Sequence, residues 1–500
     1  MPLQPVRLTG EQKKILFLPP KNPISIKGVA GCGKTTVALY RAKHLIDTYT
    51  DLFQEANVAI FTFNKALVKY MDTLLPVIPG GYQKNSKDLL DVKPGMKINV
   101  TNFHKWAYHF LTERKIPLNT LDSNQIYTKV YDAKKKYSAH RIAQKSVDFF
   151  MDEISWIKGR MICSEDEYIQ IPRKGRGTVD RVTRVDRPII WKIYQDYRSL
   201  MEKFGYVDFD DYALLCLKQI DDNDRIFSHI IIDEAQDLSK AQLTVLSKLV
   251  FNSTQSITII ADAAQRIYKS AFSWAETGIE LRGRNNVTLT KNYRNTAEIA
   301  EAAYDLLKND ADQADFTKGS LNIERHGPKP IWAHFITKSD EYNFLVDEIK
   351  EIRKSVFSFS IAVLCRNSRD TNAIHNALRT HDIPSQFVKE DKIKSFENEK
   401  VNICTMSSIK GFEFDYVFIV DLNDDIFPSR TGMDVDDNED IQIITERRLL
   451  YVCMTRAKLG LTMCSSSQPS RFLLEIDSNK IEYRSQQINP VATLEDDLPF

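Results

Sequence analysis

Short, continuous apolar runs, separated by segments long enough to form helices, recur along this 500-residue sequence. Apolar strands that alternate with helices are typical of parallel sheets covered by helices on both faces. The runs form two series, which comprise residues 24–27, 58–63, 229–233 and 257–262, and then 361–365, 401–405, 416–420 and 461–465. Because 500 residues also exceed what one compact core accommodates, the two series predict an α/β protein with two parallel-sheet domains.

A segment of different character interrupts the first series. Residues 111–205 contain few strand-like runs and many Lys, Tyr and Ile positions that suit helices. They predict a mostly helical insertion within the first domain. We therefore expect a first domain built from 1–110 and 206–286, the insertion over 111–205, a second domain over 287–476 and a flexible acidic tail over 477–500.

Composition excludes membrane and secreted proteins. The 43% hydrophobic and 27% charged residues are ordinary for a soluble enzyme, and no apolar run approaches the roughly 18 residues of a membrane-spanning helix. The seven cysteines show no Cys-x-x-Cys or Cys/His zinc spacing, so reduced, buried thiols are expected. Because the chain starts without an apolar leader, it is expected to be cytoplasmic, with no membrane partner.

Positive charge is concentrated in one part of an almost neutral chain. The 68 Lys and Arg residues and the 67 Asp and Glu residues leave a net charge of +1. Residues 129–203, however, contain 17 basic and 11 acidic side chains, and residues 173–187 contain six basic and two acidic ones. Such a run is usually a solvated face, but clustered positive charge also suits the phosphate backbone of a nucleic acid. The net charge therefore does not exclude a nucleic-acid partner.

A nucleotide-binding motif follows the first apolar run. Residues 28–35, Gly-Val-Ala-Gly-Cys-Gly-Lys-Thr, match the pattern G-x-x-x-x-G-K-[ST] between a predicted strand and a predicted helix. In such a loop, backbone N–H groups surround phosphate oxygens, the lysine reaches the β- and γ-phosphates, and the hydroxyl ligates Mg²⁺. Lys34 and Thr35 are thus the predicted phosphate and metal ligands. The alternative is a glycine-rich turn that binds no nucleotide, which the complete motif in this context disfavours.

A P-loop requires an acidic partner at the end of a neighbouring strand. The apolar run that begins at His229 ends in Asp233 and Glu234. Asp233 is the predicted second Mg²⁺ ligand, and Glu234 is the predicted base for the attacking water. Because acidic residues often do no more than end a strand, this prediction depends on the P-loop.

Ten ordered motifs resemble those of the UvrD/Rep-like superfamily 1 DNA helicases. The resemblance covers most of the chain, and the ordered set is far more specific than any one member. The matching segments are Leu8–Gln12, Gly28–Thr35, Asn64–Ala66, Asn102–His104, Asp208–Asp211, Asp233–Asp237, Asp262–Tyr268, Asn292–Arg294, Thr405–Phe414 and Arg447–Lys458. The resemblance implies two RecA-like domains, with ATP and Mg²⁺ as cofactors and with single-stranded and tailed duplex DNA as partners.

The resemblance also implies roles for individual residues. Arg294 and Arg456 match arginines that reach the γ-phosphate from the second domain, Tyr293 would stack on adenine, and Glu413 would accept a hydrogen bond from ribose. The implied catalytic residues are Lys34, Asp233, Glu234, Gln265, Arg294 and Arg456. The implied nucleotide-binding residues are Gln12, Gly28, Gly31, Gly33, Lys34, Thr35, Thr36, Tyr293 and Glu413, with Thr35 and Asp233 also holding the metal. The implied DNA-binding residues are Phe63, Asn64, Lys65, His104, Tyr268, Trp274, Arg366, Thr405 and Ser407.

Each of these residues has an ordinary alternative when it is considered singly. An isolated arginine is more often a surface or ion-pairing residue, and an aromatic residue on a strand, such as Phe61, more often belongs to a core. Only their membership in matching motifs favours the functional roles.

The resemblance implies an ATP-dependent helicase or translocase that moves from 3′ to 5′ on single-stranded DNA. The alternative is a nucleotide-gated DNA-binding subunit that senses ends or loads a partner nuclease without productive unwinding. The presence of Lys34, Glu234 and both arginines favours the motor.

Some positions depart from the family pattern. The segment between Arg369 and Thr405 is too short for the large 2B domain of full-sized members, so that domain is expected to be absent. Ser407 stands where the family typically has His, and Thr36 stands where many members have Arg. The last residues, 494–500, resemble the acidic, Pro-Phe-ending tail with which bacterial single-stranded-DNA-binding proteins recruit partners. A protein partner is therefore one expectation for this tail, and a disordered acidic end is the other.

Overall fold

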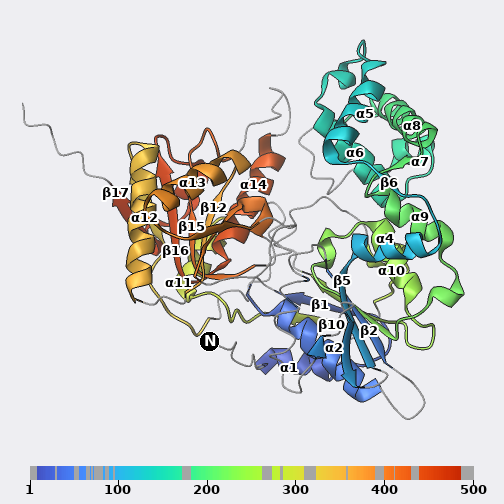
Figure 1. The fold of residues 1–500 in the computed structure, drawn as a ribbon, viewed down its shortest axis with the longest axis horizontal. Helices are drawn as coiled ribbons and strands as arrows, with labels where there is room; N and C mark the ends of the chain where they lie inside the picture. Colours follow the sequence, from blue (N-terminus) through green and yellow to red (C-terminus); the bar gives the residue numbers. More distant parts are fainter. Residues whose placement is uncertain are drawn as a thin grey trace, which may run out of the picture.

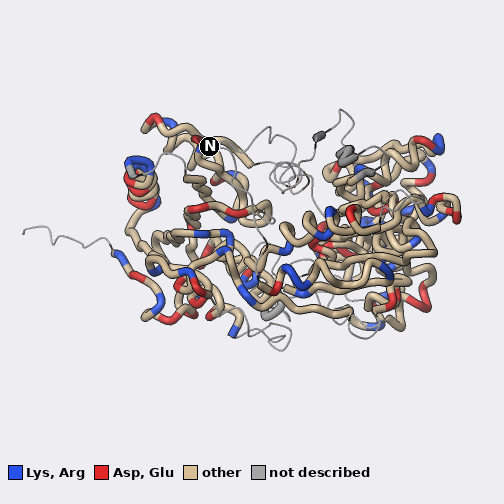
Figure 2. The backbone as a smooth tube through the Cα atoms, turned by 90° about the horizontal axis from the view of Figure 1, so that it is seen from below, with Lys and Arg blue, Asp and Glu red and all other residues tan. Residues whose placement is uncertain are grey.

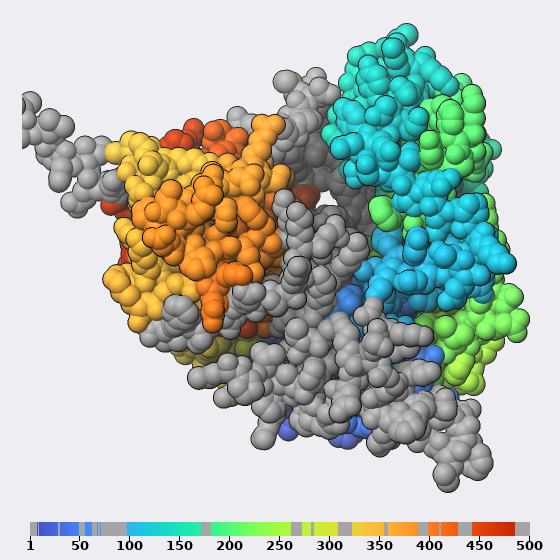
Figure 3. All heavy atoms as spheres, viewed as in Figure 1, coloured from blue at the N-terminus to red at the C-terminus, as the bar shows by residue number. Residues whose placement is uncertain are grey.

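The structure, a computed structural model, contains two α/β units and one helical unit (Figure 1). The helical unit projects beyond the first α/β unit, and the second α/β unit lies to one side (Figure 3). This is the predicted α/β architecture with two largely parallel sheets and a mostly helical insertion. The described residues are 8, 10–28, 31–49, 56–62, 68, 71, 83–84, 89–93, 96–171, 182–261, 273–281, 285–308, 323–355, 359–388, 399–409, 412–428 and 439–485.

The first sheet has eight strands in the order β10-β1-β9-β8-β2-β5-β4-β3. Its pairings are parallel from β10 to β5, and antiparallel between β5, β4 and β3. All four residues of β8 are buried, as expected for a strand covered on both faces. The strands are β1 (Ile24–Gly28), β2 (Asn57–Thr62), β3 (Gln83–Lys84), β4 (Leu89–Lys93), β5 (Met96–Asn102), β8 (His229–Ile232), β9 (Ser256–Ala261) and β10 (Asn286–Leu289).

Helices cover both faces of the first sheet. On one face, α1 (Gly10–Leu16) and α2 (Lys34–Tyr49) share a core with Ile60 of β2. On the other face, Phe61 joins a core with the helices α4 (Phe103–Glu113), α9 (Asp211–Gln219) and α10 (Lys240–Leu249). Successive strand residues point to opposite faces, which explains why these two neighbours enter different cores. Phe61 is fully buried against Trp106 and Phe227, so it is a core residue.

The helical unit has a core of its own. Phe150, Ile157, Trp191 and Tyr197 belong to one buried cluster that draws on all of its longer helices. A parallel pairing of β6 (Asn119–Thr120) with β7 (Tyr206–Val207) lies where the unit joins the first domain. The helices are α5 (Ser123–Lys135), η2 (Arg141–Gln144), α6 (Val147–Arg160), α7 (Glu165–Gln170) and α8 (Arg187–Lys203).

A buried ion cluster fixes the helical unit to the first domain. Lys158 Nζ of α6 lies 2.7 Å from Asp208 Oδ2 and 2.7 Å from Asp211 Oδ1. The Tyr197 hydroxyl of α8 donates to Asp208 Oδ2 over 2.6 Å. Although burial lowers it, the two carboxylates raise the pKa of Lys158 to about 12. The segment 208–211 therefore binds the helical unit by buried ion pairs in addition to the covalent connection of the chain.

The basic run at 173–187 is only partly described. Charged residues of both signs are interspersed over the tube in Figure 2. Residues 172–181 lie outside the described part of the chain. Arg187 donates to the carbonyl oxygens of Tyr168 over 3.2 Å and Ile171 over 3.1 Å, so it binds the end of α7. These contacts within the helical unit account for Arg187 without a nucleic acid.

The second sheet has seven parallel strands in the order β13-β14-β12-β15-β16-β11-β17. α11 (Ala297–Asp305) and α14 (Glu439–Met454) contribute to one core, and α12 (Lys338–Ser355) and α13 (Ser368–Thr380) contribute to the other. The strands are β11 (Ile331–Phe335), β12 (Ile361–Cys365), β13 (Ser385–Phe387), β14 (Val401–Thr405), β15 (Phe414–Ile419), β16 (Ala457–Ser466) and β17 (Glu482–Ser485). Within the described residues, the structure has no helix long and apolar enough to span a membrane.

Two boundaries differ from the sequence prediction. β10 pairs with β1, so the first sheet extends to Leu289 and beyond the predicted end of that domain at 286. η10 (Ser478–Lys480) and β17, which pairs with β11, show that residues 478–485 belong to the second domain rather than to a flexible tail. Both are four-residue edge strands without a continuous apolar run, so the sequence pattern does not reveal them. The tail at 494–500 lies outside the described residues.

Replacing Lys158 with Met should destabilise the protein by about 3–5 kcal/mol, because two buried carboxylates would lose their cation. The loss is measured as a shift of the urea unfolding transition followed by tryptophan fluorescence. Lys43→Met is the matched control, since its pair with Asp47 is solvent-exposed and contributes less than about 0.5 kcal/mol. Similar shifts for both variants would contradict the role of the buried cluster.

Candidate active site

The P-loop joins the end of β1 to the start of α2. Gly31 and Gly33 both have a φ of +79°, which glycine adopts without strain. A methyl group on Gly33 would lie 2.5 Å from Gln12 Nε2, so the loop is closely enclosed. Lys34 is 7% exposed and donates from Nζ to the Gly28 carbonyl over 3.0 Å. A side chain at Gly31 or Gly33 would collide with neighbouring residues, and the Lys34 ammonium group lies across the loop. This arrangement fits a loop that binds the phosphates of a nucleotide.

Thr35 and Asp233 are in contact although 198 positions separate them in the sequence. Thr35 Oγ1 donates to Asp233 Oδ2 over 2.8 Å. β1 and β8 are parallel members of one sheet, so the residues that follow them meet at its carboxyl edge. Burial, reinforced by the adjacent Glu234, raises the pKa of Asp233 to about 7.

These two oxygen ligands fit a Mg²⁺ ion that is shared with a nucleotide. Mg²⁺ prefers hydroxyl, carboxylate and phosphate oxygens and is usually held by only one or two protein carboxylates. Among the described residues, no group of three or more His, Cys, Asp or Glu side chains could hold a metal ion. Thr35 and Asp233 would therefore hold the ion together with phosphate oxygens rather than in a closed protein site.

Glu234 has a backbone conformation that non-glycine residues adopt rarely. Its φ is +53°, and the residue is 6% exposed. Gln236 donates to its carboxylate, and the Glu234 backbone N–H donates to Asp233 Oδ1 over 3.1 Å. Backbone strain of this kind persists only where the surroundings enforce it, and it often marks a functional site. Both predicted acidic residues therefore lie together at the end of β8.

The short helix α1 places two residues beside the nucleotide site. Gln12, predicted to recognise adenine, donates from Nε2 to the Cys32 carbonyl of the P-loop over 2.8 Å. Glu11 accepts from the Thr290 backbone N–H over 2.9 Å and from its hydroxyl over 2.8 Å. The sequence does not reveal this role of Glu11, because its partner lies 279 positions away. Glu11 thus connects α1 to the segment that enters the second domain.

Arg41 of α2 is a second residue that sequence reasoning missed. It is fully buried, and its guanidinium donates to four backbone carbonyl oxygens at the end of α1. Burial lowers the pKa of Arg41 to about 10. The acceptors are the carbonyl oxygens of Ile15 at 3.3 Å, Leu16 at 3.0 Å, Leu18 at 2.8 Å and Pro19 at 2.6 Å. An arginine on a helix carries no sequence signal for such a role, which depends on the tertiary position of α1.

The connection between the two α/β units packs directly on the P-loop. The Tyr293 backbone N–H donates to the Gly31 carbonyl over 2.9 Å. A methyl group on Gly31 would lie 2.1 Å from Asn292 Oδ1 and 3.0 Å from Arg294 Cβ. The Tyr293 hydroxyl would lie 3.4 Å from a methyl group on Gly10, so its ring is beside α1. The structure therefore brings the segment Asn292–Arg294 and the phosphate loop together.

Arg294 and Glu413, predicted to contact the γ-phosphate and the ribose, form an ion pair with each other. Arg294 Nε lies 2.6 Å from Glu413 Oε2, and Lys458 Nζ lies 3.1 Å from Glu413 Oε1. Against the effect of burial, these two cations hold the pKa of Glu413 well below its usual range. A ribose hydroxyl that approaches Glu413 must therefore compete with Arg294. Lys458 lies within a recognised motif, but only the structure gives it this partner.

Arg456, the other predicted arginine finger, lies inside the second domain. It is 1% exposed and donates from Nε to the Val452 carbonyl over 3.0 Å and from Nη1 to the Phe412 carbonyl over 3.3 Å. Its neighbour Thr455 accepts from Arg294 Nη1 over 3.5 Å. The two arginines are therefore close in space. Arg294 lies beside the P-loop, whereas Arg456 would have to give up its present hydrogen bonds before it could contact a phosphate.

The predicted DNA contacts of the first domain lie near α4 and η5. His104 of α4 contacts the ring of Phe209 with a centroid separation of 5.5 Å. Phe209, within the motif Asp208–Asp211, is 51% exposed. Trp274, the first residue of η5 (Trp274–Thr277), is partly buried against the first-domain core. The predictions for Phe63, Asn64, Lys65, Gln265 and Tyr268 lie outside the described residues.

The predicted DNA contacts of the second domain follow β12 and β14. Arg366 forms two hydrogen bonds of 2.9 Å with the carboxylate of Glu446 on α14. Thr405 Oγ1 lies 3.3 Å from the hydroxyl oxygen of Ser407, which is exposed. Both strands end at the carboxyl edge of the second sheet, so these residues share one edge. Their DNA roles stay predictions.

Two family models match most of the chain. The UvrD/REP helicase N-terminal domain matches residues 8–285, and the UvrD-like helicase C-terminal domain matches residues 287–397 and 388–468. The chain belongs to the UvrD-like helicase family. The match of the N-terminal model includes the helical unit.

Several curated relatives of the chain are named as DNA helicases. The ATP-dependent DNA helicase srs2 of Schizosaccharomyces pombe is 26% identical over 79% of this chain and 45% of its own length. The probable DNA helicase of Mycoplasma pneumoniae is 24% identical, covering 91% of this chain and 84% of its own length. The ATP-dependent DNA helicase PcrA of Staphylococcus epidermidis is 22% identical over 74% of this chain and 50% of its own length. This UvrD-like chain thus spans about half the length of srs2 and PcrA.

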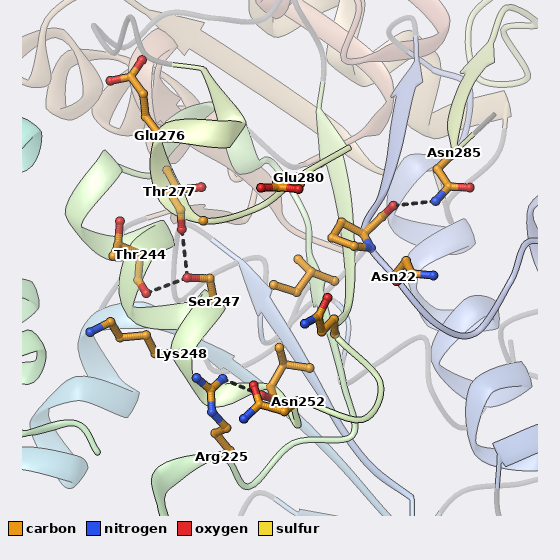
Figure 4. Close-up of a pocket in the computed structure, with 15 residues that line it drawn as sticks. Asn22, Arg225, Thr244, Ser247, Lys248, Asn252, Glu276, Thr277, Glu280 and Asn285 are labelled. Atoms are coloured by element: carbon orange, nitrogen blue, oxygen red, sulfur yellow. Dashed lines mark hydrogen bonds between the residues drawn. The ribbon is translucent and has the colours of Figure 1, made fainter. Parts of the chain in front are cut away.

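A cavity of about 660 Å³ lies away from this UvrD-like nucleotide site (Figure 4). Arg225 and Lys248 lie at one end of it, and Glu276 lies at the other. Glu276 is paired with Arg160 over 3.3 Å. The lining includes residues that precede β1, β9 and β10, namely Pro23, Gln255 and Asn285. The cavity therefore lies at the amino-terminal edge of the sheet, opposite the P-loop.

Gly31→Ala should weaken nucleotide binding by about tenfold or more, because the added methyl group would displace Asn292 and overpacking costs about 1–3 kcal/mol. The affinity is measured by titration with a fluorescent ATP analogue. Gly278→Ala is the matched control, since Gly278 also has a φ of +79° but its nearest neighbour, Ser247 Oγ, would lie 3.6 Å away. Equal losses of affinity in the two variants would argue against a role for the Gly31 contact.

Proposed function

We propose that this protein is an ATP- and Mg²⁺-dependent DNA helicase or translocase that moves on single-stranded DNA. The observation that carries the proposal is the contact of Asn292–Arg294 with Gly31 of the P-loop. A motor must change shape with its nucleotide state, and a residue of a second domain at the phosphate site couples the two. Relatives named as ATP-dependent DNA helicases support the same activity.

The residues of the first domain have separable tasks in this proposal. Bound ATP supplies the transferable phosphoryl group, and bound Mg²⁺ neutralises its charge. The P-loop backbone and Lys34 hold the phosphates, while Thr35 and Asp233 hold the cation. Glu234, enclosed at the end of β8, removes the proton from the attacking water. Gln12 would recognise the adenine, and Tyr293, whose hydroxyl lies beside α1, would stack on it.

Partner exchange at Glu413 links nucleotide binding to domain movement in this proposal. Arg294 leaves Glu413 Oε2 to meet the γ-phosphate, and the released oxygen accepts a hydrogen bond from ribose. Lys458 stays with Oε1 and keeps Glu413 ionised. Arg294 lies beside the P-loop and Glu413 lies in the second domain, so a change in their ion pair couples the phosphate site to movement of that domain. Opening after product release restores the ion pair and completes one step along the strand.

The short connection between β12 and β14 supports a member without a 2B domain. α13 and β13 both lie in this connection, which runs only from residue 366 to residue 400, and residues 389–398 lie outside the described part of the chain. We propose that such a compact motor translocates from 3′ to 5′, the polarity implied by the motifs. A protein partner for residues 494–500 also belongs to this proposal.

Lys34→Ala and Arg456→Ala should both abolish ATP turnover, and the arginine variant should still bind ATP. Loss of an arginine finger lowers turnover by about 10³-fold or more. Turnover is measured with and without single-stranded DNA. Arg484→Ala is the control, because this arginine lies on the exposed edge strand β17. Retention of DNA-stimulated ATPase activity in either active-site variant, with circular dichroism like that of the unmodified protein, would refute the site assignment.

A strand-displacement assay tests polarity and separates the motor from its alternative. We expect displacement of a duplex with a 3′ tail and none of a duplex with a 5′ tail. An ATPase that single-stranded DNA does not stimulate would refute the motor. Stimulated ATPase activity without displacement of either duplex would favour a translocase or a loading subunit over a helicase.

A further inference from the structure

An exposed aromatic ring, Phe204, stacks on the half-buried ring of Tyr206 where the helical unit joins the first domain. Phe204 follows the last residue of α8, Tyr206 begins β7, and Gly205 between them has a φ of +64°. The left-handed turn lets both rings lie on one side of the chain, where they stack with centroids 5.8 Å apart and an interplanar angle of 25°. Phe204 is 50% exposed, so the stack is open to solvent.

Two lysines surround this pair. Lys129 Nζ of α5 lies 5.3 Å from the ring centroid of Phe204 and 5.9 Å from that of Tyr206. Lys203 Nζ lies 5.6 Å from the ring centroid of Phe204. The neighbouring acidic residue, Glu202, is paired with Arg198 over 2.9 Å. Both ammonium groups therefore lie near aromatic rings, and no ion pair with a carboxylate is found for either of them among the described residues.

We propose that Phe204, Tyr206, Lys129 and Lys203 form a binding site for single-stranded nucleic acid, which we term the aromatic patch. One base of the strand stacks on the exposed ring, and the ammonium groups bind the flanking phosphates. A stacking surface combined with positive charge is the chemistry of sequence-independent single-strand binding. The inference rests on the proposed function, because it adds a site for the strand on which the motor moves.

The position of the aromatic patch supports this occupant. The chain continues from Tyr206 through β7 to Phe209, whose half-exposed ring contacts the predicted DNA ligand His104. The patch therefore adjoins a predicted DNA contact of the first domain. It also belongs to the segment 129–206, which includes the basic region with 17 positive and 11 negative side chains. The junction at β6 and β7 lies between the helical unit and the helices α4 and α9 (Figure 1). A strand that extends from His104 toward the helical unit would meet the lysines and the exposed ring of Phe204 there.

A structural role is the alternative for the same contacts. Lys129 and Lys203 could shield the rings from water, and the stack could stabilise the turn between α8 and β7. This role predicts that loss of the ring lowers stability and leaves DNA affinity unchanged. The two roles therefore differ in the quantity that a substitution changes.

The test measures the affinity of the full chain for a fluorescein-labelled oligo(dT) by fluorescence anisotropy. Phe204→Leu retains apolar contact with Tyr206 but removes the aromatic face, and the Kd should rise about fivefold or more. Phe204→Tyr should retain the affinity. Lys129→Gln should reduce the slope of log affinity against log salt by about 0.7. With a backbone of abasic sugars, the unmodified protein and Phe204→Leu should bind alike.

Phe17→Leu is the matched control, because Phe17 is 82% exposed and lies beyond the end of α1. Unchanged oligo(dT) affinity of Phe204→Leu would overturn the aromatic patch, whether or not the unfolding transition shifts. An equal loss in Phe17→Leu would overturn it as well. The unmodified protein tests the proposed function separately. Failure of that protein to bind DNA would refute the motor, whereas binding that is indifferent to Phe204 would refute only the patch.

Discussion

The hydrogen bond from the Tyr293 N–H to the Gly31 carbonyl is the contact on which the arrangement of the nucleotide site depends. It joins the chain that enters the second domain to the phosphate loop of the first without an intervening side chain. The close approach of Asn292 and Arg294 requires glycine at position 31. Glu11 reinforces the junction by binding Thr290. A displacement of the loop is therefore transmitted directly to the second domain.

The two sides of this junction carry opposite excess charge: carboxylates predominate at Asp233 and Glu234, and cations predominate around Glu413. In the first domain, burial and the adjacent Glu234 raise the pKa of Asp233 to about 7. In the second domain, Arg294 and Lys458 both bind Glu413 and hold its pKa low. A magnesium nucleotide carries a cation suited to the first side and phosphate charge suited to Arg294. The two sides thus favour one ligand that spans them.

The parts of the fold that were predictable are those in which burial dictates the residue pattern. The central strands are apolar because helices cover both faces, and Lys34, Thr35, Asp233 and Glu234 follow such strands at one edge. β10 and β17 are not predictable in this way, because each is a four-residue edge strand without a continuous apolar run. The sequence also does not reveal which charged residues pair with each other, because Arg294 and Glu413 are 119 positions apart and meet only in the folded chain. Sequence periodicity contains no such information, and the DNA contacts stay predictions for the same reason.

The order of strands in the first sheet has a consequence for synthesis of the protein. β1, which precedes the P-loop, lies between β9 and β10, so both of its neighbours are made more than two hundred positions later. The helical unit draws its core from residues 121–206 and can form sooner from contacts nearer in the chain. A nascent chain therefore carries an unpaired apolar β1 while the insertion folds. β1 has both of its neighbouring strands only after Leu289 has left the ribosome, and the proposed ATP site is completed later still, after Arg456.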